Sequence, residues 1–253
     1  MGLQQINRGL GLALLLGACA GETPPSMKDT VGTGEPGPLT HRFSFAVIAD
    51  PHIAGPDDHE VRLEAAVDWI NTHAADRNIQ LVLVLGDIGW GEGLPTSLEL
   101  LSDLEMSWVP IVGDNVVISE QGSEFAEVFA DQYSRLSETL EGWEKQETPV
   151  WDPNYELEVT LQNLRFEHEG VLFVGSDWNI RGIGGLAAEF ADLHDFEGGS
   201  WPFFVESLEG VEARPSASVN LLSHIPLMAG ALSVEEVAQV DTTTAPLGTW
   251  IDS

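Results

Sequence analysis

The sequence predicts an α/β fold, in which buried strands alternate with helices, and three observations support this class. Five short runs rich in Val, Ile, Leu and Phe, bounded by Gly, Pro or Ser, are typical of strands buried on both faces. Apolar residues recur at helical spacing between the early runs. Each run stops at an Asp or a His. The runs are residues 43–48, 81–85, 109–112, 171–174 and 219–222.

Helices are predicted over residues 61–71 and 123–140, where apolar side chains fall on one helical face. In the first of these segments the pattern includes Val61, Ala65 and Trp69, spaced four residues apart. Helices thus alternate with strands in the first half of the chain, whereas residues 157–174 predict a hairpin in the second half. The roughly 210 residues from position 41 onward suit one domain.

The residues that end the five runs carry the functional signal. In open α/β sheets, ligands bind in the crevice beyond the carboxyl ends of the strands. We therefore expect the chain to deliver acidic and imidazole side chains to one edge of a sheet. The residues that end the runs are Asp50, Asp87, Asp114, Asp177 and His224.

The first run ends in an Asp-x-His motif, with Asp50 and His52 separated by one residue. In extended backbone, side chains two residues apart point in the same direction. Both are then expected to bind one divalent ion. A carboxylate oxygen together with an imidazole nitrogen suits Zn, Mn or Fe better than Ca or Mg.

The next motifs are Gly86-Asp87 and Gly113-Asp114-Asn115. A glycine before each aspartate is expected to let the backbone turn sharply and approach a bound ion without a Cβ in the way. The last run leads into Ser-His-x-Pro, in which His224 supplies a second imidazole. Taken singly, each motif is more often a structural turn or a hydrogen-bonded histidine than a metal ligand.

Taken in order, these motifs resemble those of the calcineurin-like metallophosphoesterases, over about residues 43–228. The resemblance implies a four-layer αββα sandwich of mixed α/β (α+β) type. It also implies two divalent metal ions, Mn, Fe or Zn, that activate water to hydrolyse a phosphomonoester or phosphodiester.

The resemblance also implies a role for each site residue. Asp50 and His52 would bind one metal ion, and Asp87 would bridge both ions. The second ion would be bound by Asp114 and His224, with Asp114 in place of the family's Asn. Asn115 stands where the family has a histidine that assists the leaving group, and an amide cannot donate a proton as an imidazolium can.

One family motif, the C-terminal Gly-His-x-His, is missing, and no histidine follows His224. Each metal would then lack one imidazole. Either the domain is shortened, with a sandwich incomplete at its C-terminus, or residues 240–253 have diverged beyond recognition. The competing interpretation is a catalytically impaired or non-catalytic surface lipoprotein that keeps the phosphoesterase fold.

The N-terminus predicts export and lipid anchoring. Arg8 precedes a short apolar stretch and small residues, as in a secretory signal spanning residues 1–18. The Leu-x-Ala-Cys sequence ending at Cys19 resembles the bacterial lipobox, in which the cysteine is lipidated. Residues 19–40 are rich in Gly, Pro, Thr and Ser and predict a flexible tether. Residues 41–253 then form the phosphoesterase domain, held at the periplasmic face or surface of the outer membrane.

The formal net charge of −31 restricts the partners of the protein. So acidic a surface disfavours binding to nucleic acid through phosphate contacts. It also repels anionic phosphate esters, so a phosphate-ester substrate requires bound metal to invert the local field. The oligomeric state is not indicated by the sequence.

Overall fold

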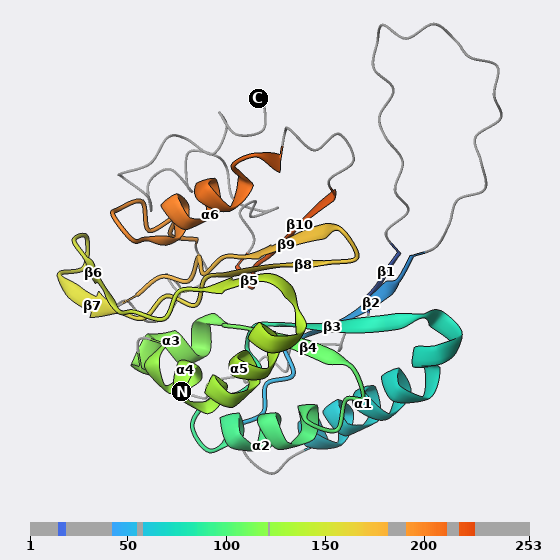
Figure 1. Ribbon diagram of the computed structural model, residues 1–253. Coiled ribbons are helices and arrows are strands. Elements are labelled where there is room, and N and C mark those ends of the chain that lie inside the picture. The colour runs from blue at the N-terminus through green and yellow to red at the C-terminus, as the bar shows by residue number, and fades with distance from the viewer. Residues whose placement is uncertain are drawn as a thin grey trace, which may run out of the picture.

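The protein has a mixed α/β fold, which confirms the predicted class at that level (Figure 1). A computed structural model describes residues 15–18, 42–54, 58–120, 122–181, 191–211 and 218–225. Its strands form two four-stranded sheets and one two-stranded sheet.

The first sheet contains the first three predicted strands, which run parallel to one another. Its order is β1-β2-β3-β4, and β1 pairs antiparallel with β2. Most residues of β2, β3 and β4 are buried, as expected for a parallel sheet covered on both faces. The bounds are β1 Leu15–Ala18, β2 Ser44–Ala49, β3 Ile79–Leu85 and β4 Ser107–Ile111.

Helices α1 and α2 connect the parallel strands and lie along the lower side of this sheet in Figure 1. The predicted helix over residues 61–71 is confirmed and is longer, but Val61 of the expected apolar face is 64% exposed, and Leu63, Val67 and Ile70 are buried instead. Residues 123–140 form two helices. The interruption occurs at Phe129, which is fully buried between the rings of Phe125 and Trp108. The bounds are α1 Asp58–Arg77, α2 Gly93–Leu101, α3 Asp114–Glu120, α4 Ser123–Val128 and α5 Ala130–Thr139.

The second sheet has the order β10-β9-β8-β5. The hairpin predicted over residues 157–174 is partly confirmed: β8 and β9 form it, whereas β7 pairs with β6 in a separate hairpin. Helix α6 (Ser200–Leu208) lies on the outer side of this sheet in Figure 1. The bounds are β5 Glu141–Lys145, β6 Val150–Asp152, β7 Leu157–Val159, β8 Leu164–His168, β9 Val171–Gly175 and β10 Ser218–Leu222.

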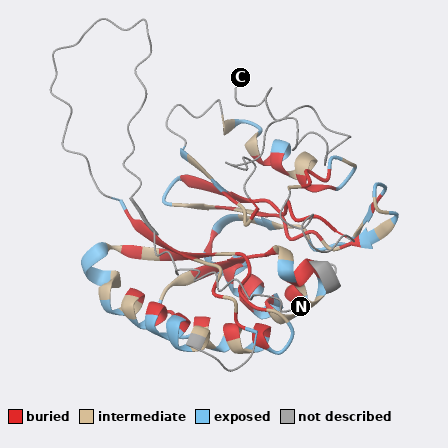
Figure 2. Ribbon diagram, turned by 180° about the vertical axis from the view of Figure 1, so that it is seen from behind, coloured by how far each residue is buried: buried red, intermediate tan, exposed pale blue. Residues whose placement is uncertain are grey.

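The elements stack as helices, sheet, sheet and helix, and buried residues follow both sheets (Figure 2). The rings of Phe45 on β2 and Phe173 on β9 meet edge to face at 5.8 Å and join the two sheets. A smaller cluster, which includes Trp178 and Phe204, packs α6 onto the outer face of the second sheet. Burying each of these large apolar side chains contributes about 1.5–3 kcal/mol.

Two expectations about the strands are wrong. Strand β10 is not buried on both faces, because it lies at the end of its sheet and Leu221 is 48% exposed. The five strand ends also belong to two sheets and not to one. The ends of β2, β3 and β4 meet those of β9 and β10 because the sheets pack face to face.

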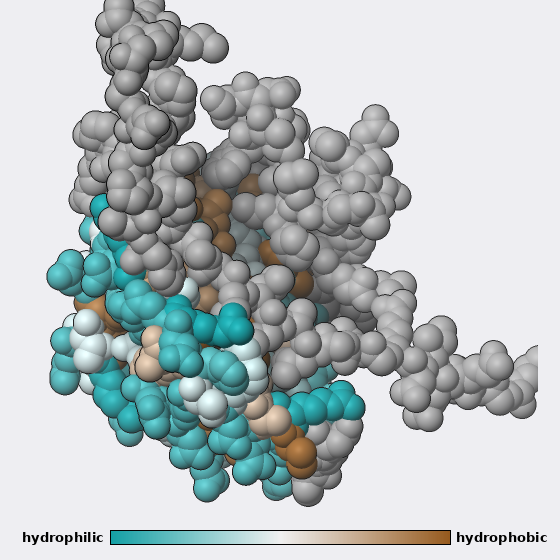
Figure 3. Space-filling view, turned by 90° about the vertical axis from the view of Figure 1, so that its right-hand side faces the viewer, coloured by the Kyte–Doolittle hydropathy of each residue, from teal (hydrophilic) through white to brown (hydrophobic). Residues whose placement is uncertain are grey.

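Hydrophilic residues dominate the described part of the face shown in Figure 3. Among the described residues, no helix is long and apolar enough to cross a membrane. Strand β1 belongs to the predicted signal sequence, and the structure does not test that assignment. Cys19, the predicted tether and residues 240–253 lie outside the described residues.

Candidate metal centre

The structure brings together the five side chains predicted to bind metal. They form two groups, Asp50, His52 and Asp87, and then Asp87, Asp114 and His224. Within each group, one ligand atom from each residue lies within 4.8 Å of the others. Asp87 belongs to both groups, as expected for a bridging carboxylate. Asp177, which ends the fourth predicted strand, belongs to neither group.

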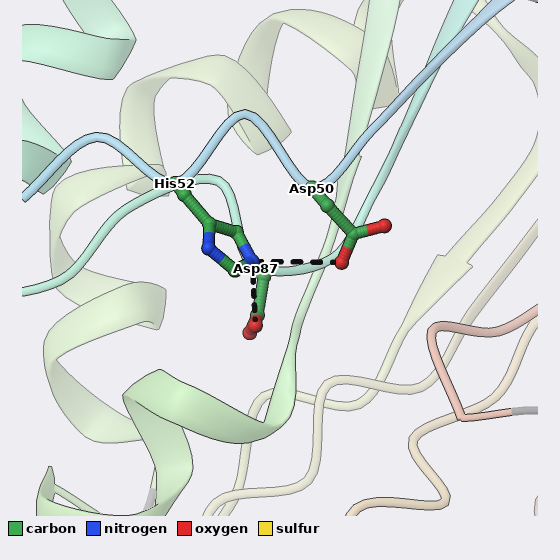
Figure 4. A group of neighbouring side chains, drawn as sticks. All are labelled: Asp50, His52 and Asp87. Atoms are coloured by element: carbon green, nitrogen blue, oxygen red, sulfur yellow. Dashed lines mark ion pairs between the residues drawn. The ribbon is translucent and has the colours of Figure 1, made fainter. Parts of the chain in front are cut away.

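The first group lies at the ends of β2 and β3 (Figure 4). The Nε2 atom of His52 is 3.2 Å from Asp87 Oδ2 and 3.7 Å from Asp50 Oδ1. The side chain of Asp87 is 5% exposed, whereas that of Asp50 is 37% exposed, so the group opens to solvent on the Asp50 side. The ring of Trp90 stands edge to face against His52 at 5.4 Å and forms one wall.

The second group joins β3, β4 and the residues after β10. The Nε2 atom of His224 is 3.0 Å from Asp114 Oδ1 and 3.7 Å from Asp87 Oδ1. Its Nδ1 donates to the backbone carbonyl of Leu85 at 3.3 Å. A histidine that binds a metal through one nitrogen usually donates a hydrogen bond through the other. His224 is therefore oriented with Nε2 toward Asp114 and Asp87, where it could act as a ligand once deprotonated.

The backbone at the first group is left-handed, which differs from the extended conformation expected for Asp-x-His. The φ angles are 53° at Asp50, 56° at His52 and 43° at Asp87. Such angles cost roughly 1–2 kcal/mol per residue other than glycine. The segment is held in this shape by the amide of His52, which donates to the Asp87 carbonyl at 2.9 Å. The two side chains meet because the chain turns back on itself.

Gly86 and Gly113 have a different role from the expected close approach to an ion. A Cβ at Gly86 would lie 2.2 Å from the ring of His224, and one at Gly113 would lie 2.0 Å from the amide nitrogen of Asp87. Gly86 also has a φ of 68°. Both glycines thus make room for the residues of the site itself.

Asn115 holds the shared carboxylate. Its backbone amide donates to Asp87 Oδ1 at 3.1 Å, and its side-chain Nδ2 donates to Asp87 Oδ2. Both oxygens of Asp87 are therefore fixed by one residue at the start of α3. A catalytic role of Asn115 at a leaving group stays a prediction.

The carboxylates of the site raise the pKa of both of its histidines. Hydrogen bonds to Asp50 and Asp87 raise the pKa of His52 from 6.5 to about 9. Burial alone would lower the pKa of His224, yet the hydrogen bond to Asp114 and the nearby carboxylates raise it. Burial would raise the pKa of Asp87, but the hydrogen bond from His52 and the charge of His224 lower it. Protons thus balance the carboxylates when no cation is bound.

The donor chemistry fits divalent metal ions. Each group offers carboxylate oxygens and one imidazole nitrogen, the ligands that zinc, manganese and iron accept in proteins. A bound cation would replace the protons on the histidines, since imidazole must be neutral to bind metal. Each group can therefore hold a metal ion.

A buried polar network behind the site was missed at the level of sequence. His194 is fully buried; its Nδ1 is 3.2 Å from Asp152 Oδ2, and its Nε2 is 2.9 Å from the carbonyl of Asn179. Both neighbours accept hydrogen bonds; the bond to Asp152 and the charge of Asp192 raise the pKa of His194 against the effect of burial. Asp177 pairs there with Arg181, so its carboxylate is already engaged. His194 does not end an apolar run, so no local pattern marked it.

No protein-family model matches the chain, and no curated protein matches it. The resemblance to the calcineurin-like metallophosphoesterases therefore rests on the motif residues themselves. The structure adds that these residues, which follow one another in the family's order, also lie close together in space.

Proposed function

We propose that the protein is a metal-dependent phosphoesterase that hydrolyses a phosphomonoester or phosphodiester. The observation that carries the proposal is the position of Asp87, a buried carboxylate shared by two groups that each contain a second aspartate and a histidine. A shared carboxylate is the natural means of setting the spacing of two ions. We further propose that these are two divalent ions, Mn, Fe or Zn.

Two such ions clamp phosphoryl oxygens and make water a better nucleophile at neutral pH. The protein itself would hold the ions and orient the side chains that bind them. Asn115 fixes both oxygens of Asp87, and the carbonyl of Leu85 orients His224. Trp90 gives the site an apolar wall against which the organic part of an ester can pack.

The order of layers supports a metallophosphoesterase-type αββα sandwich, with helices outside two facing sheets. The family's Gly-His-x-His motif does not occur in the sequence. Among the described residues each group has three candidate ligands, one fewer than the family's set implies. The missing imidazole should weaken metal affinity, and the extra negative charge of Asp114 would make the ions less able to acidify water, so hydrolysis should be slow and faster above neutral pH.

The test is hydrolysis of bis(4-nitrophenyl) phosphate and 4-nitrophenyl phosphate with added Mn or Zn. We expect slow, metal-dependent turnover of at least one of the two compounds. Asp87→Ala should abolish it, whereas Asp76→Ala, an exposed acid on α1, should not. Equal rates for the wild type and Asp87→Ala would refute the proposal.

The competing proposal is a surface lipoprotein that binds metal without turnover. It is favoured by Asn115, which replaces an imidazole and is engaged with Asp87. Grafting a C-terminal segment with Gly-His-x-His from a full-length family member separates the two. A rate at least about tenfold higher supports an enzyme short of ligands; an inert graft that still binds metal supports the lipoprotein.

A further inference from the structure

A cavity of about 360 Å³, separate from the candidate metal centre, opens between α5 and β5. Its volume falls in the range of small-molecule sites. The residues that line it include the aromatic Tyr133 and Trp143 and the charged Lys145 and Glu147. None of the described lining residues belongs to the metal centre.

The position of Lys145 is well defined. Its Nζ lies 4.7 Å from the centre of the Tyr133 ring and donates to the carbonyl of Gln146 at 3.1 Å. The hydroxyl of Tyr133 donates to the carbonyl of Pro110 at 3.0 Å, which fixes the ring beneath the amine. The amine is thus held against an aromatic wall.

The charge state of this lysine is unusual. Burial lowers the pKa of Lys145 from 10.5 to about 8, although the charges of Glu147 and Asp177 oppose the shift. A substantial part of the amine is therefore neutral near physiological pH, which makes it a nucleophile. The chain contains only one other lysine, Lys28, in the predicted tether.

The surroundings select the ligand. Glu147 disfavours an anion, and the partly charged amine disfavours a cation. The aromatic walls favour a planar, apolar body. A neutral, planar aromatic molecule meets these conditions on charge and shape. An electrophilic carbon on that molecule would match the nucleophilic amine of Lys145.

We propose that the α5–β5 cavity binds a small neutral aromatic aldehyde and that Lys145 forms an imine with its carbonyl carbon. The nitrogen lone pair of the neutral amine attacks that carbon, forming the C–N bond. The carbonyl oxygen then leaves as water with the two hydrogens of the amine. No oxidant or reductant is needed.

The test uses the full chain with benzaldehyde and cyanoborohydride, which reduces the imine to a stable amine, at about pH 7.5. Peptide mapping by mass spectrometry compares labelling of Lys145 with that of Lys28. We expect Lys145 to react on the order of tenfold faster, given its lower pKa. The rate should saturate with benzaldehyde concentration, and 4-carboxybenzaldehyde should react more slowly.

Two controls distinguish binding from simple reactivity. Ala130→Trp places a large ring at the exposed edge of the cavity and should slow labelling of Lys145 but not of Lys28. Benzyl alcohol, which cannot form an imine, should protect Lys145 without any substitution. Labelling of Lys145 no faster than that of Lys28, or a rate that neither saturates nor responds to benzyl alcohol, would overturn the proposal.

Discussion

Asp87 is the residue on which both halves of the metal centre depend. Its side chain is 5% exposed and contacts His52, Asn115 and His224. Without this carboxylate, neither group keeps three ligands. The consequences of its loss should therefore exceed those of losing any other single ligand.

We expect Asp87→Ala to lose most bound metal, and His224→Ala to lose about one equivalent, because His224 belongs to one group only. Metal content after gel filtration, measured by elemental analysis, checks both. Asp76→Ala is the matched control, since Asp76 is exposed on α1. Unchanged metal in Asp87→Ala would exclude a dinuclear centre.

Gly86→Ala should displace His224 and weaken the second group. Gly91 offers a matched control, because it also has a positive φ, 53°, but a Cβ there would have nothing within 4 Å. Both substitutions incur about 1 kcal/mol of backbone strain; Gly86→Ala adds the clash with the imidazole. Only Gly86→Ala should lower the metal content. Equal metal content in the two variants would show that the clash is relieved without moving His224.

The pKa of His52 predicts a pH dependence of the free energy of unfolding in the absence of metal. Because this pKa rises from 6.5 to about 9 on folding, the charged imidazole stabilises the fold fully below pH 6.5. That contribution is lost as the pH rises through about 9. Relative to His52→Gln, the wild type should lose at most about 3 kcal/mol over this window.

Urea denaturation in the presence of a chelator, between about pH 6 and 9.5, measures this difference. Added Zn should reverse the trend, because metal binding requires neutral imidazole and strengthens as the pH rises. A difference between wild type and His52→Gln that does not change with pH would contradict the assignment of the pKa shift to the contacts with Asp50 and Asp87.

At the scale of elements, the contact between the two sheets determines where the strand ends meet. Phe173 is fully buried, stacks on Phe166 at 4.8 Å and meets Phe45 across the interface at 5.8 Å. These rings hold β9 against β2, and β9 pairs with β10, which leads to His224. The position of the second imidazole therefore depends on the packing of the sheets.

Phe173→Ala should lower the free energy of unfolding by about 3–5 kcal/mol, because it leaves a cavity at this interface. Leu221→Ala in the same sheet is the control: Leu221 is 48% exposed on β10, so its truncation should cost less than about 1 kcal/mol. Chemical denaturation of the two variants gives the comparison. Similar costs would show that β10 is buried in solution.

At the scale of the whole molecule, the net charge restricts what the protein can bind, and lipid anchoring at Cys19 stays a prediction. The net charge of −31 repels phosphate esters from the surface, so metal-free protein should bind them poorly. Strand β1 lies before Cys19, so cleavage of the predicted signal would remove it and leave β2 as an edge strand.

The predicted lipid anchor is tested by labelling in a bacterial host. Labelled palmitate should enter through Cys19, and Cys19→Ser should either release a soluble form or leave the precursor uncleaved. Membrane fractionation with mass spectrometry of the N-terminal peptide gives the result. An unlipidated wild type that stays in the cytoplasm would show that the export prediction is wrong.

The sequence alone determined the positions of five of the ten described strands and the identity of the candidate ligands. Runs of apolar residues and the polar residues that end them are local features. They can be recognised within one short segment because a buried strand requires apolar side chains along its length. Asp50, Asp87 and Asp114 were therefore recognisable by their position after a strand. The structure places each of them in one or both groups of the candidate metal centre.

Only the tertiary structure decided how these residues meet. The contact of His224 with Leu85 spans 139 residues, and that of His194 with Asp152 spans 42. The left-handed backbone of the Asp-x-His segment is held by Asp87, and the role of Gly86 depends on His224. Both partners are also distant in the sequence. Contacts of this kind arise from strand pairing and from the packing of segments far apart in the chain, which no periodicity within one segment encodes.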